Sequence, residues 1–547
     1  MAKHQFITVQ WKGIMILLQN LSYIHPNKDL LFENLYLSVN QYEKAALIGN
    51  NGSGKSTLLK IIAGELQASG GNVKIDAKLY YIPQIFGQYD HQSIAEALGV
   101  DARLKALKEI LSGNTEEEQF AALEDDWGIE ERCREAMHHW KLDDFSLETA
   151  MSDLSGGQKT RVFLAGIMIH EPGIVLLDEP SNHLDLDART ILYDFIQNAK
   201  MTILLVSHDR KLLNLVEEIY ELQEGEIVTY GGNYDHYIEQ KNIAYNAMQQ
   251  DVKNKEKALR KAKAVERETA ERQQRLDARG KKKSEKAGVA KIMMNTLRNN
   301  AEKSTSKLKG IHEEKVQSIM QELKDSRESL AGNDSMKFDF DSSKLHKGKL
   351  LFSAKAVNFS YDNRENLWSK NLVFDINSGE RIALVGKNGS GKTSLIKMVL
   401  GSLEPTTGTV YRADFQPVYI DQDYSLIQNH LTVYQQAQAF NQAKLQEHEI
   451  KIRLARFLFT QDAWDKPCRV LSGGERLRLA LCCLGMRAEA PGMIVLDEPT
   501  NNLDIQNIEI LTAAIKDYIG TLLIVSHDQS FLEEVKIGRT IDLNSFV

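Results

Sequence analysis

Five short motifs occur twice in this chain, in the same order, and they constrain its fold more than any other feature. A glycine-rich loop, GNNGSGKS, begins at Gly49 and returns as GKNGSGKT at Gly386. Each loop is followed by a glutamine, an LSGG run, an acidic pair after an apolar stretch, and a VSHD run. Two copies of one ordered set predict two related domains, and a length of 547 residues accommodates them.

The spacing between the motifs differs between the two halves at one place. The glycine-rich loops are 337 residues apart, whereas the LSGG serines, Ser155 and Ser472, are 317 apart. The first half therefore carries roughly 20 additional residues before its LSGG run (337 − 317). We place this insert in the charged, helix-like stretch 101–130. The expected organisation is an N-terminal extension at 1–14, a first domain at 15–240, a linker at 241–345 and a second domain at 346–547.

Short apolar runs alternate with helical stretches in both halves. The first half contains AALIG, IVLLD and TILLVS, and the second contains IALVG, MIVLD and TLLIVS. Continuous apolar runs of this length are typical of parallel strands that are covered on both faces of a sheet. The predicted fold class is therefore α/β, with two tandem domains.

Composition excludes several classes of protein. We find no run of 18 or more apolar residues and no apolar segment before a cleavage site near the N-terminus, so we expect neither a membrane domain nor a signal peptide. The four cysteines, Cys133, Cys468, Cys482 and Cys483, show no metal-ligand spacing. We therefore expect these cysteines to be reduced thiols and the protein to be cytoplasmic.

The middle of the chain is basic although the whole chain has a net charge of -8. Residues 241–330 contain 23 Lys and Arg against 13 Asp and Glu, and residues 271–310 contain 12 against 4. The segment is rich in strong helix formers, with a thin apolar seam that includes Val252, Leu259 and Leu323, so we predict two long antiparallel helices forming a hairpin. A solvated spacer would explain the helices, whereas the basic residues near the turn favour a polyanionic partner.

Both glycine-rich loops match GxxxxGK[ST] between an apolar strand and a helix, which is the context that a phosphate-binding loop requires. The backbone N–H groups would face the β-phosphate, Lys55 and Lys392 would reach the β/γ-phosphates, and Ser56 and Thr393 would hold Mg²⁺. The residues predicted to bind nucleotide here are Gly49, Asn50, Asn51, Gly52, Ser53, Gly54, Lys55, Ser56 and Thr57, and Gly386, Lys387, Asn388, Gly389, Ser390, Gly391, Lys392, Thr393 and Ser394.

Two acidic pairs follow buried strands. Asp178 and Asp497 end these strands, where an unpaired carboxylate would be costly, so a metal ion is the natural partner. Glu179 and Glu498 come next and are candidates for the base that polarises an attacking water.

Three further pairs of residues complete the predicted sites. Gln84 and Gln422 each follow a strand, where an amide can meet both the metal and the water. His208 and His527 each lie 30 residues after the aspartate and can contact the γ-phosphate. Tyr23 and Tyr361 precede the loops and could stack on adenine, although packing in the core is an alternative.

These motifs together resemble the ATP-binding cassette superfamily: Walker A, Q-loop, LSGGQ or LSGGE signature, Walker B, D-loop and H-switch, each present twice. Two cassettes in one chain with a charged helical linker resemble the ABC-F subfamily. The resemblance implies Mg²⁺-dependent ATP hydrolysis by a monomer whose two cassettes close head to tail over two ATP molecules. Each ATP would then lie between one phosphate loop and the signature of the other cassette, which brings in Ser155, Gly156 and Gly157 on one side and Ser472, Gly473 and Gly474 on the other.

The sequence departs from the family pattern at two D-loop positions. Ser181 stands where the family usually has threonine, and Asn502 where it often has histidine. The second change leaves open whether the two sites hydrolyse ATP at equal rates.

The resemblance also implies a partner. ABC-F proteins bind the ribosome near the tRNA exit site, with the linker directed toward the peptidyl-transferase centre. The residues expected to meet rRNA or tRNA phosphates are Lys281, Lys282, Lys283, Lys286, Lys291 and Arg298. Two roles fit this placement, which are protection of the ribosome from an antibiotic and regulation or rescue of translation. Two other classes remain as alternatives, the ATPase subunit of a membrane transporter and a DNA-maintenance ATPase.

Overall fold

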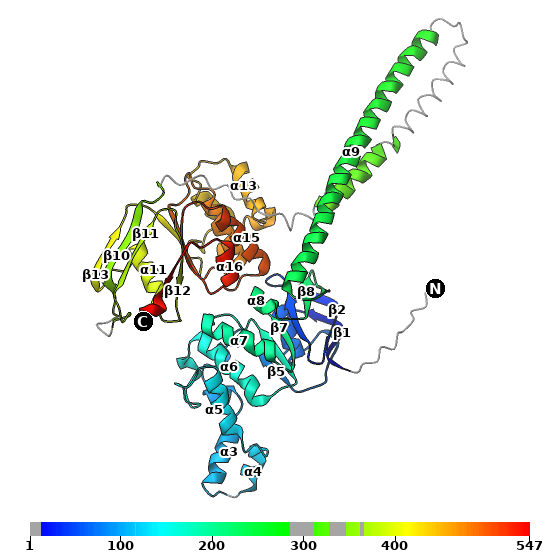
Figure 1. The fold of residues 1–547 in the computed structure, drawn as a ribbon. Coiled ribbons are helices and arrows are strands. Elements are labelled where there is room, and N and C mark those ends of the chain that lie inside the picture. Colours follow the sequence, from blue (N-terminus) through cyan, green and yellow to red (C-terminus); the bar gives the residue numbers. More distant parts are fainter. Residues whose placement is uncertain are drawn as a thin grey trace, which may run out of the picture. The chain divides into compact units, whose positions relative to one another are not determined.

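The computed structural model describes residues 13–114, 116–284, 310–311, 313–327, 346–361 and 366–546 (Figure 1). The chain divides into two compact units. One unit comprises Met1–Tyr237 and Met336–Val547 and contains both cassettes; the other comprises Ile238–Ser335 and contains most of the linker.

The first cassette is built on two sheets. A six-stranded sheet has the order β5-β6-β7-β3-β8-β9, and its neighbouring strands are parallel except for β8 and β9. A three-stranded antiparallel sheet has the order β2-β1-β4. The strands are β1 (Ile14–Ile24), β2 (Leu30–Asn40), β3 (Lys44–Ile48), β4 (Gly70–Ile75), β5 (Leu79–Ile82), β6 (Ile174–Asp178), β7 (Thr202–Val206), β8 (Glu218–Gln223) and β9 (Glu226–Gly231).

The second cassette repeats this plan with one strand fewer. Its five-stranded sheet is parallel throughout, in the order β14-β15-β16-β12-β17, and its antiparallel sheet has the order β11-β10-β13. The strands are β10 (Leu350–Asn358), β11 (Leu372–Asn377), β12 (Arg381–Val385), β13 (Thr407–Arg412), β14 (Pro417–Ile420), β15 (Met493–Asp497), β16 (Thr521–Val525) and β17 (Arg539–Asp542). The predicted α/β class with two tandem domains is confirmed.

The central strands are made of branched apolar residues, and this composition explains their position. Strands β6, β7, β15 and β16 are buried along their whole length. Val, Ile and Leu pack well on a pleated surface that is covered on both sides. The carboxyl ends of these strands therefore form a rigid edge, and the acidic pairs and histidines follow directly from it.

Helices start where the motifs end. In the first cassette these are α1 (Lys55–Ile62), α6 (Gly156–His170), α7 (Leu186–Asn198) and α8 (Arg210–Leu213). Their counterparts in the second cassette are α11 (Lys392–Leu400), α14 (Gly473–Leu484), α15 (Ile505–Asp517) and α16 (Gln529–Glu534). Each helix thus presents its N-terminus beside a motif residue.

The stretch between β5 and α6 is longer than its counterpart between β14 and α14. It forms α2 (Ile94–Ala97), α3 (Asp101–Leu111), α4 (Glu117–Leu123) and α5 (Ile129–His139), where the second cassette has α12 (Val433–Ala439) and α13 (Glu447–Arg456). The two helices α3 and α4 lie in the range 101–130 where the sequence places an insert, and Figure 1 shows them projecting from the rest of their cassette.

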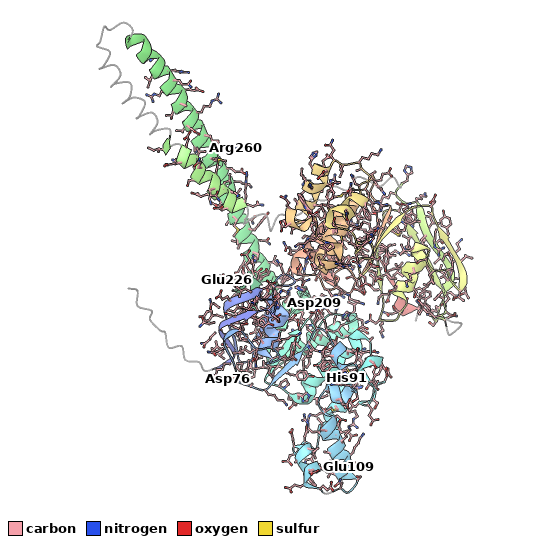
Figure 2. All side chains as sticks on the ribbon, turned by 180° about the vertical axis from the view of Figure 1, so that it is seen from behind. Asp76, His91, Glu109, Asp209, Glu226 and Arg260 are labelled. Carbon is pink, nitrogen blue, oxygen red and sulfur yellow. The ribbon has the colours of Figure 1, made fainter. Side chains whose placement is uncertain are left out.

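The linker begins as one long helix, α9 (Tyr234–Ser284), which has 51 residues and would extend about 75 Å at 1.5 Å per residue. Side chains project outward along it, Arg260 among them (Figure 2). Residues 313–327 form a second helical run beside α9: Lys255 Nζ donates to Ser326 Oγ at 2.8 Å, and Arg327 pairs with Glu256 at 2.6 Å. The predicted helical linker is confirmed, and the turn of the predicted hairpin lies outside the described residues.

Two expectations from composition can be compared with the structure. All four cysteines are free thiols and are buried. None of the described helices combines the length and apolar character needed to cross a lipid bilayer.

Candidate functional site

The two phosphate loops have similar backbone angles at the glycine that precedes each helix. Gly54 and Gly391 precede α1 and α11 with φ of 102° and 88°, in the left-handed region that favours glycine. A Cβ atom at Gly54 would lie 2.8 Å from Leu31 Cδ2, and one at Gly391 would lie 2.6 Å from Leu367 Cδ2. A glycine cannot cap its helix with a side chain, so the first N–H groups of both helices remain available to an anion.

The lysine of each loop turns back over the loop. Lys55 Nζ donates to the carbonyl oxygens of Gly49 (2.8 Å) and Asn50 (3.0 Å), and Lys392 Nζ donates to those of Gly386 (2.8 Å) and Lys387 (3.1 Å). Burial lowers the pKa of both lysines, and the neighbouring carboxylates oppose this shift. Each ammonium group is therefore held where the sequence predicts the β/γ-phosphates.

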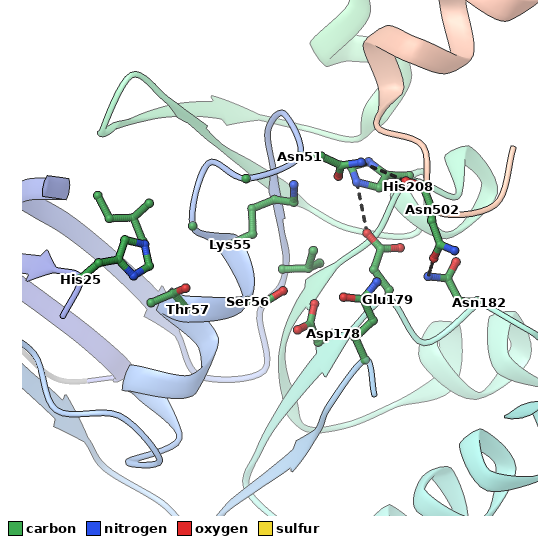
Figure 3. A pocket seen from close by; sticks show the side chains of 15 residues that line it. His25, Asn51, Lys55, Ser56, Thr57, Asp178, Glu179, Asn182, His208 and Asn502 are labelled. Atoms are coloured by element: carbon green, nitrogen blue, oxygen red, sulfur yellow. Dashed lines mark hydrogen bonds and ion pairs between the residues drawn. The ribbon is translucent and has the colours of Figure 1, made fainter. Parts of the chain in front are cut away.

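A cavity of about 400 Å³ lies at the first phosphate loop (Figure 3). Its lining brings together residues that the sequence predicts for one site, namely Asn51, Gly52, Gly54, Lys55, Ser56, Thr57, Gln84, Asp178, Glu179 and His208. It also includes Asn182 and, from the second cassette, Asn502, which are joined by a hydrogen bond of 3.3 Å. Residues separated by more than 400 positions in the sequence thus line a single cavity.

The environment of Asp178 fits a magnesium ion. Asp178 is 2% exposed, and its Oδ1 has no hydrogen-bond partner among the described residues. Burial raises its pKa, whereas a hydrogen bond with Ser56 and the charge of Lys55 lower it. One carboxylate, one hydroxyl and the nearby amide of Gln84 are oxygen donors of the kind that Mg²⁺ takes together with substrate phosphates. A bound Mg²⁺ would neutralise charge on those phosphates.

Glu179, the candidate general base, is held by its surroundings. Its φ of 52° is unusual for a residue with a side chain, and its N–H donates to the Val206 carbonyl at 2.9 Å. Its Oε1 lies 3.3 Å from His208 Nε2, as the dashed line in Figure 3 shows. Burial raises the pKa of Glu179 well above its usual range and lowers that of His208 to about 3, so this imidazole is neutral at physiological pH.

The second site repeats this geometry closely. Glu498 has φ 48° and donates its N–H to the Val525 carbonyl at 2.8 Å, and its Oε1 lies 3.2 Å from His527 Nε2. Burial raises the pKa of Glu498 to about 7 and lowers that of His527 to about 4. Asp497 is 6% exposed, and its Oδ2 accepts a hydrogen bond from the Tyr419 hydroxyl at 3.1 Å. Gln422 lies just after β14 and is exposed.

The signature serines cap their own helices. The Ser155 hydroxyl accepts from the Gln158 N–H while Gln158 Oε1 accepts from the Ser155 N–H, which is a capping box. Ser472 and Glu475 form the same arrangement at α14. Each serine is exposed, so the first backbone N–H groups of α6 and α14 lie at the surface of the cassette.

Both phosphate loops contact the opposite cassette through the segment that follows its acidic pair. The N–H of Asn51 donates to Asp504 Oδ2 at 3.0 Å, and its side chain donates to the Asn502 carbonyl at 2.9 Å. In the other direction, Asn388 Nδ2 donates to the His183 carbonyl at 3.1 Å. A Cβ atom on the signature glycine Gly157 would lie 3.5 Å from Asn388 Nδ2. The first signature therefore adjoins the second phosphate loop, whereas the lining of the first cavity contains Asn502 and no residue of the second signature.

The tyrosines predicted to stack on adenine lie apart from the cavity lining. Tyr23 is partly buried and packs against the core of its cassette, 6.2 Å from the Phe32 ring. The cavity lining instead contains His25, two residues further along and 5.4 Å from the Tyr23 ring. Tyr361 is 52% exposed, and its hydroxyl lies 2.8 Å from Ser394 Oγ on α11. A role for either tyrosine in binding adenine stays a prediction.

Three of the six residues predicted to bind RNA lie within the described part of the linker. Lys281, Lys282 and Lys283 belong to the last turns of α9. Lys286, Lys291 and Arg298 lie outside the described residues. Their roles stay predictions.

Comparison with known proteins gives consistent matches over nearly the whole chain. A model of the ABC transporter family matches residues 32–182 and 369–501. The chain is 32% identical over 544 residues to the ATP-binding protein YdiF of Bacillus subtilis, covering 94% of this chain and 78% of that protein. It is 27% identical over 572 residues to ABC transporter F family member 5 of Arabidopsis thaliana, covering 99% and 74%. In fold, it resembles the archaeal ribosome recycling factor aABCE1 in its complex with the ribosomal stalk protein aP1, with a TM-score of 0.57 and 20% identity over 96% of this chain and 87% of the other.

Proposed function

Because this chain belongs to the ATP-binding cassette family, is of the ABC-F type and is an ATP hydrolase, we propose that it binds ATP at two composite sites and acts on the ribosome. In this proposal the basic linker reaches toward the tRNA and peptidyl-transferase region, in the cytoplasm. ATP closes the two cassettes and fixes the linker in its binding pose, and hydrolysis releases it. The observation that carries the proposal is a long basic helical linker between two complete hydrolytic sets.

The two sites support repeated cycles of ATP binding and hydrolysis. Each glutamate lies beside a neutral histidine and follows an aspartate at the end of a buried strand. This arrangement can orient a water molecule toward the γ-phosphate while the lysine of the loop stabilises negative charge. The contacts from Asn51 and Asn388 to the opposite cassette support composite sites, since each loop meets the partner segment that follows Glu498 or Glu179.

The charge of the linker supports a nucleic-acid partner. Its excess of ten positive charges (23 − 13) stands against an acidic remainder of the chain. Lysine and arginine that neutralise phosphates give binding that is largely independent of sequence and falls steeply with salt. A ribosome offers such a phosphate surface.

The proposal is tested by trapping the closed state. The double variant Glu179→Gln, Glu498→Gln should bind ATP but hydrolyse it about 10²–10⁴-fold more slowly, because the general base is lost at both sites. With ATP it should co-sediment with ribosomes in a sucrose gradient, and high salt should release it. A matched control adds Lys55→Ala and Lys392→Ala, which remove ATP binding and should leave the protein at the top of the gradient.

Recovery of the double variant free of ribosomes in the presence of ATP would contradict the ribosome proposal. A second variant separates the linker from the ATP sites: Lys281, Lys282 and Lys283 are changed together to Gln in the double variant. We expect ribosome binding to weaken while ATP binding stays unchanged. An unaltered ribosome affinity would remove these three lysines from the proposed interface.

The two proposed roles on the ribosome, protection from antibiotics and regulation of translation, can be distinguished by assay. Expression in a drug-sensitive strain should raise resistance to antibiotics of the peptidyl-transferase centre or exit tunnel if the protein protects the ribosome. If it regulates translation, drug resistance should not change, and the trapped variant should slow protein synthesis in a cell-free system. The long linker favours protection.

A further inference from the structure

Arg189 is one difference between the surroundings of the two candidate catalytic centres. Arg189 lies on α7 of the first cassette and is 8% exposed. The position 319 residues later, the spacing that relates Asp178 to Asp497, is Ile508 on α15. Isoleucine cannot supply a charge or a hydrogen bond at that position. The second cassette instead holds its own segment through Arg478, which donates to Asn507 Oδ1 at 2.8 Å, while Asn507 Nδ2 donates to Asp504 Oδ1 at 2.7 Å.

Arg189 connects two segments of its own cassette that adjoin catalytic residues. Its Nε donates to the Leu184 carbonyl at 3.1 Å, and its Nη1 lies 3.6 Å from Asp209 Oδ2. The same Asp209 oxygen accepts from the Tyr193 hydroxyl at 2.5 Å, and its other oxygen caps α8 directly after His208. A buried arginine without partners would be costly, so these contacts hold the guanidinium group in place. Figure 2 labels Asp209.

The segment that Arg189 holds is the one that meets the second phosphate loop. Asn388 donates to the carbonyl of His183, which directly precedes Leu184. Lys387 Nζ lies 3.9 Å from Asp187 Oδ2. Arg189 therefore supports the contact between the first cassette and the loop that contains Lys392, because it holds the residue next to His183.

The charge of Arg189 also acts on the pair Glu498 and His527. Burial raises the pKa of Glu498, and the charge of Arg189 is the foremost influence that opposes burial there, ahead of Lys392. Arg189 also contributes to lowering the pKa of His527, after burial and Lys392. At the first site, Lys55 is the cation among the described residues that acts on Glu179 and His208.

We propose that Arg189 is a positioning residue that the first cassette contributes to the ATP site of the second phosphate loop. It acts through the Leu184 carbonyl and Asp209 by fixing the segment 182–187 against Asn388 and Lys387. The proposal rests on ATP hydrolysis and not on ribosome binding.

The experiment measures each site separately. Glu179→Gln removes the base of the first site and leaves the second active, and Glu498→Gln does the reverse. Arg189→Ile, which copies the residue of the second cassette, is then added to each. We expect kcat of the Glu179→Gln protein to fall about tenfold, equivalent to about 1.4 kcal/mol, with a smaller change in KM, and kcat of the Glu498→Gln protein to change less than about twofold.

Two further variants keep the test decisive. Arg189→Lys should recover part of the lost kcat, because the charge returns without the paired donors. If Arg189→Ile does not fold, as judged by circular dichroism and thermal unfolding, Arg189→Gln is measured in both backgrounds, since glutamine keeps one donor and loses the charge. Equal losses at both sites, or no loss at the second site, would overturn the proposal.

Discussion

The first and second catalytic centres are almost identical within a few ångströms and differ immediately beyond. The glutamate–histidine distances are 3.3 and 3.2 Å, and the glutamate φ angles are 52° and 48°. Outside this core, the position of Arg189 in the first cassette corresponds to Ile508 in the second. His183 likewise corresponds to Asn502, and these two residues both have positive φ. The geometry of the candidate catalytic residues is therefore duplicated, whereas the residues that each cassette contributes to the opposite phosphate loop differ.

The largest expected effect tests the shared chemistry. Replacing Glu179 and Glu498 together by Gln should lower ATP turnover by about 10²–10⁴-fold, because both general bases are lost. Phosphate release under steady-state conditions measures this effect, and fluorescent ATP analogues check that binding is retained. If the double variant keeps most of its activity, the two glutamates are not the bases and the centres are alike for another reason.

The second prediction tests the shared backbone of the phosphate loops. Gly54→Ala and Gly391→Ala should each lower the free energy of unfolding by more than about 1 kcal/mol, because alanine is strained at positive φ and its Cβ meets a leucine. Each should also weaken ATP binding by its own cassette. Gly231→Ala is the control, since a Cβ atom there meets nothing within 4 Å and φ is not positive. A large loss of stability in one cassette alone would show that the two loops differ in energy although their glycines have similar backbone angles.

The third prediction uses pH to sharpen the difference between the centres. A base must be ionised to act, so a raised pKa moves the acidic limb of the rate profile upward. In the Glu179→Gln protein, kcat/KM should rise through about pH 7 as Glu498 ionises. In the Glu498→Gln protein the rise should come at higher pH, because burial raises the pKa of Glu179 further, and Lys55 and a backbone hydrogen bond with His208 oppose this shift only in part.

The histidines should add no limb between pH 6 and 9, since burial keeps both imidazoles neutral in that range. Adding Arg189→Ile to the Glu179→Gln protein should move its limb upward. If the acidic limbs of the two kcat/KM profiles coincide, the two sites do not have the electrostatic difference that we predict.

The smallest expected effect concerns an exposed ion pair at the contact between the two cassettes. Asp187 and Lys387 are 55% and 67% exposed, and their counterparts are Gln506 and Asn50. Asp187→Gln should change kcat at the second site by less than about twofold, and less still at high salt, because exposed pairs are screened by solvent. A tenfold loss would mean that the surface pair, and not Arg189, distinguishes the sites.

Much of this organisation is predictable from the sequence because the motifs are short and their chemistry is local. The loops around Lys55 and Lys392 and the acidic pairs lie where strand ends and glycine spacing place them. The capping boxes at Ser155 and Ser472 also have a sequence signature, a serine followed three residues later by Gln158 or Glu475.

Other features depend on tertiary packing. Tyr23 faces the core because an irregularity between Leu18 and Leu21 shifts the alternation of β1 by one residue. His25 reaches the cavity because it follows the end of that strand. The positive φ of Glu179 is imposed by its hydrogen bond to Val206, which no local pattern records. The role of Arg189 emerges only when non-motif positions of the two halves are compared, since Arg189 and Ile508 belong to no motif.

The burial of the cysteines has a practical consequence for following the linker by fluorescence. Burial raises the pKa of the Cys133 thiol to about 11 and that of Cys482 and Cys483 further, so few thiolates are available to maleimide dyes. A cysteine introduced at an exposed position of α9, such as Val265, which is 49% exposed, should therefore label selectively without removal of the native thiols. A dye at that position would report the environment of the linker in the wild-type background through each round of ATP turnover.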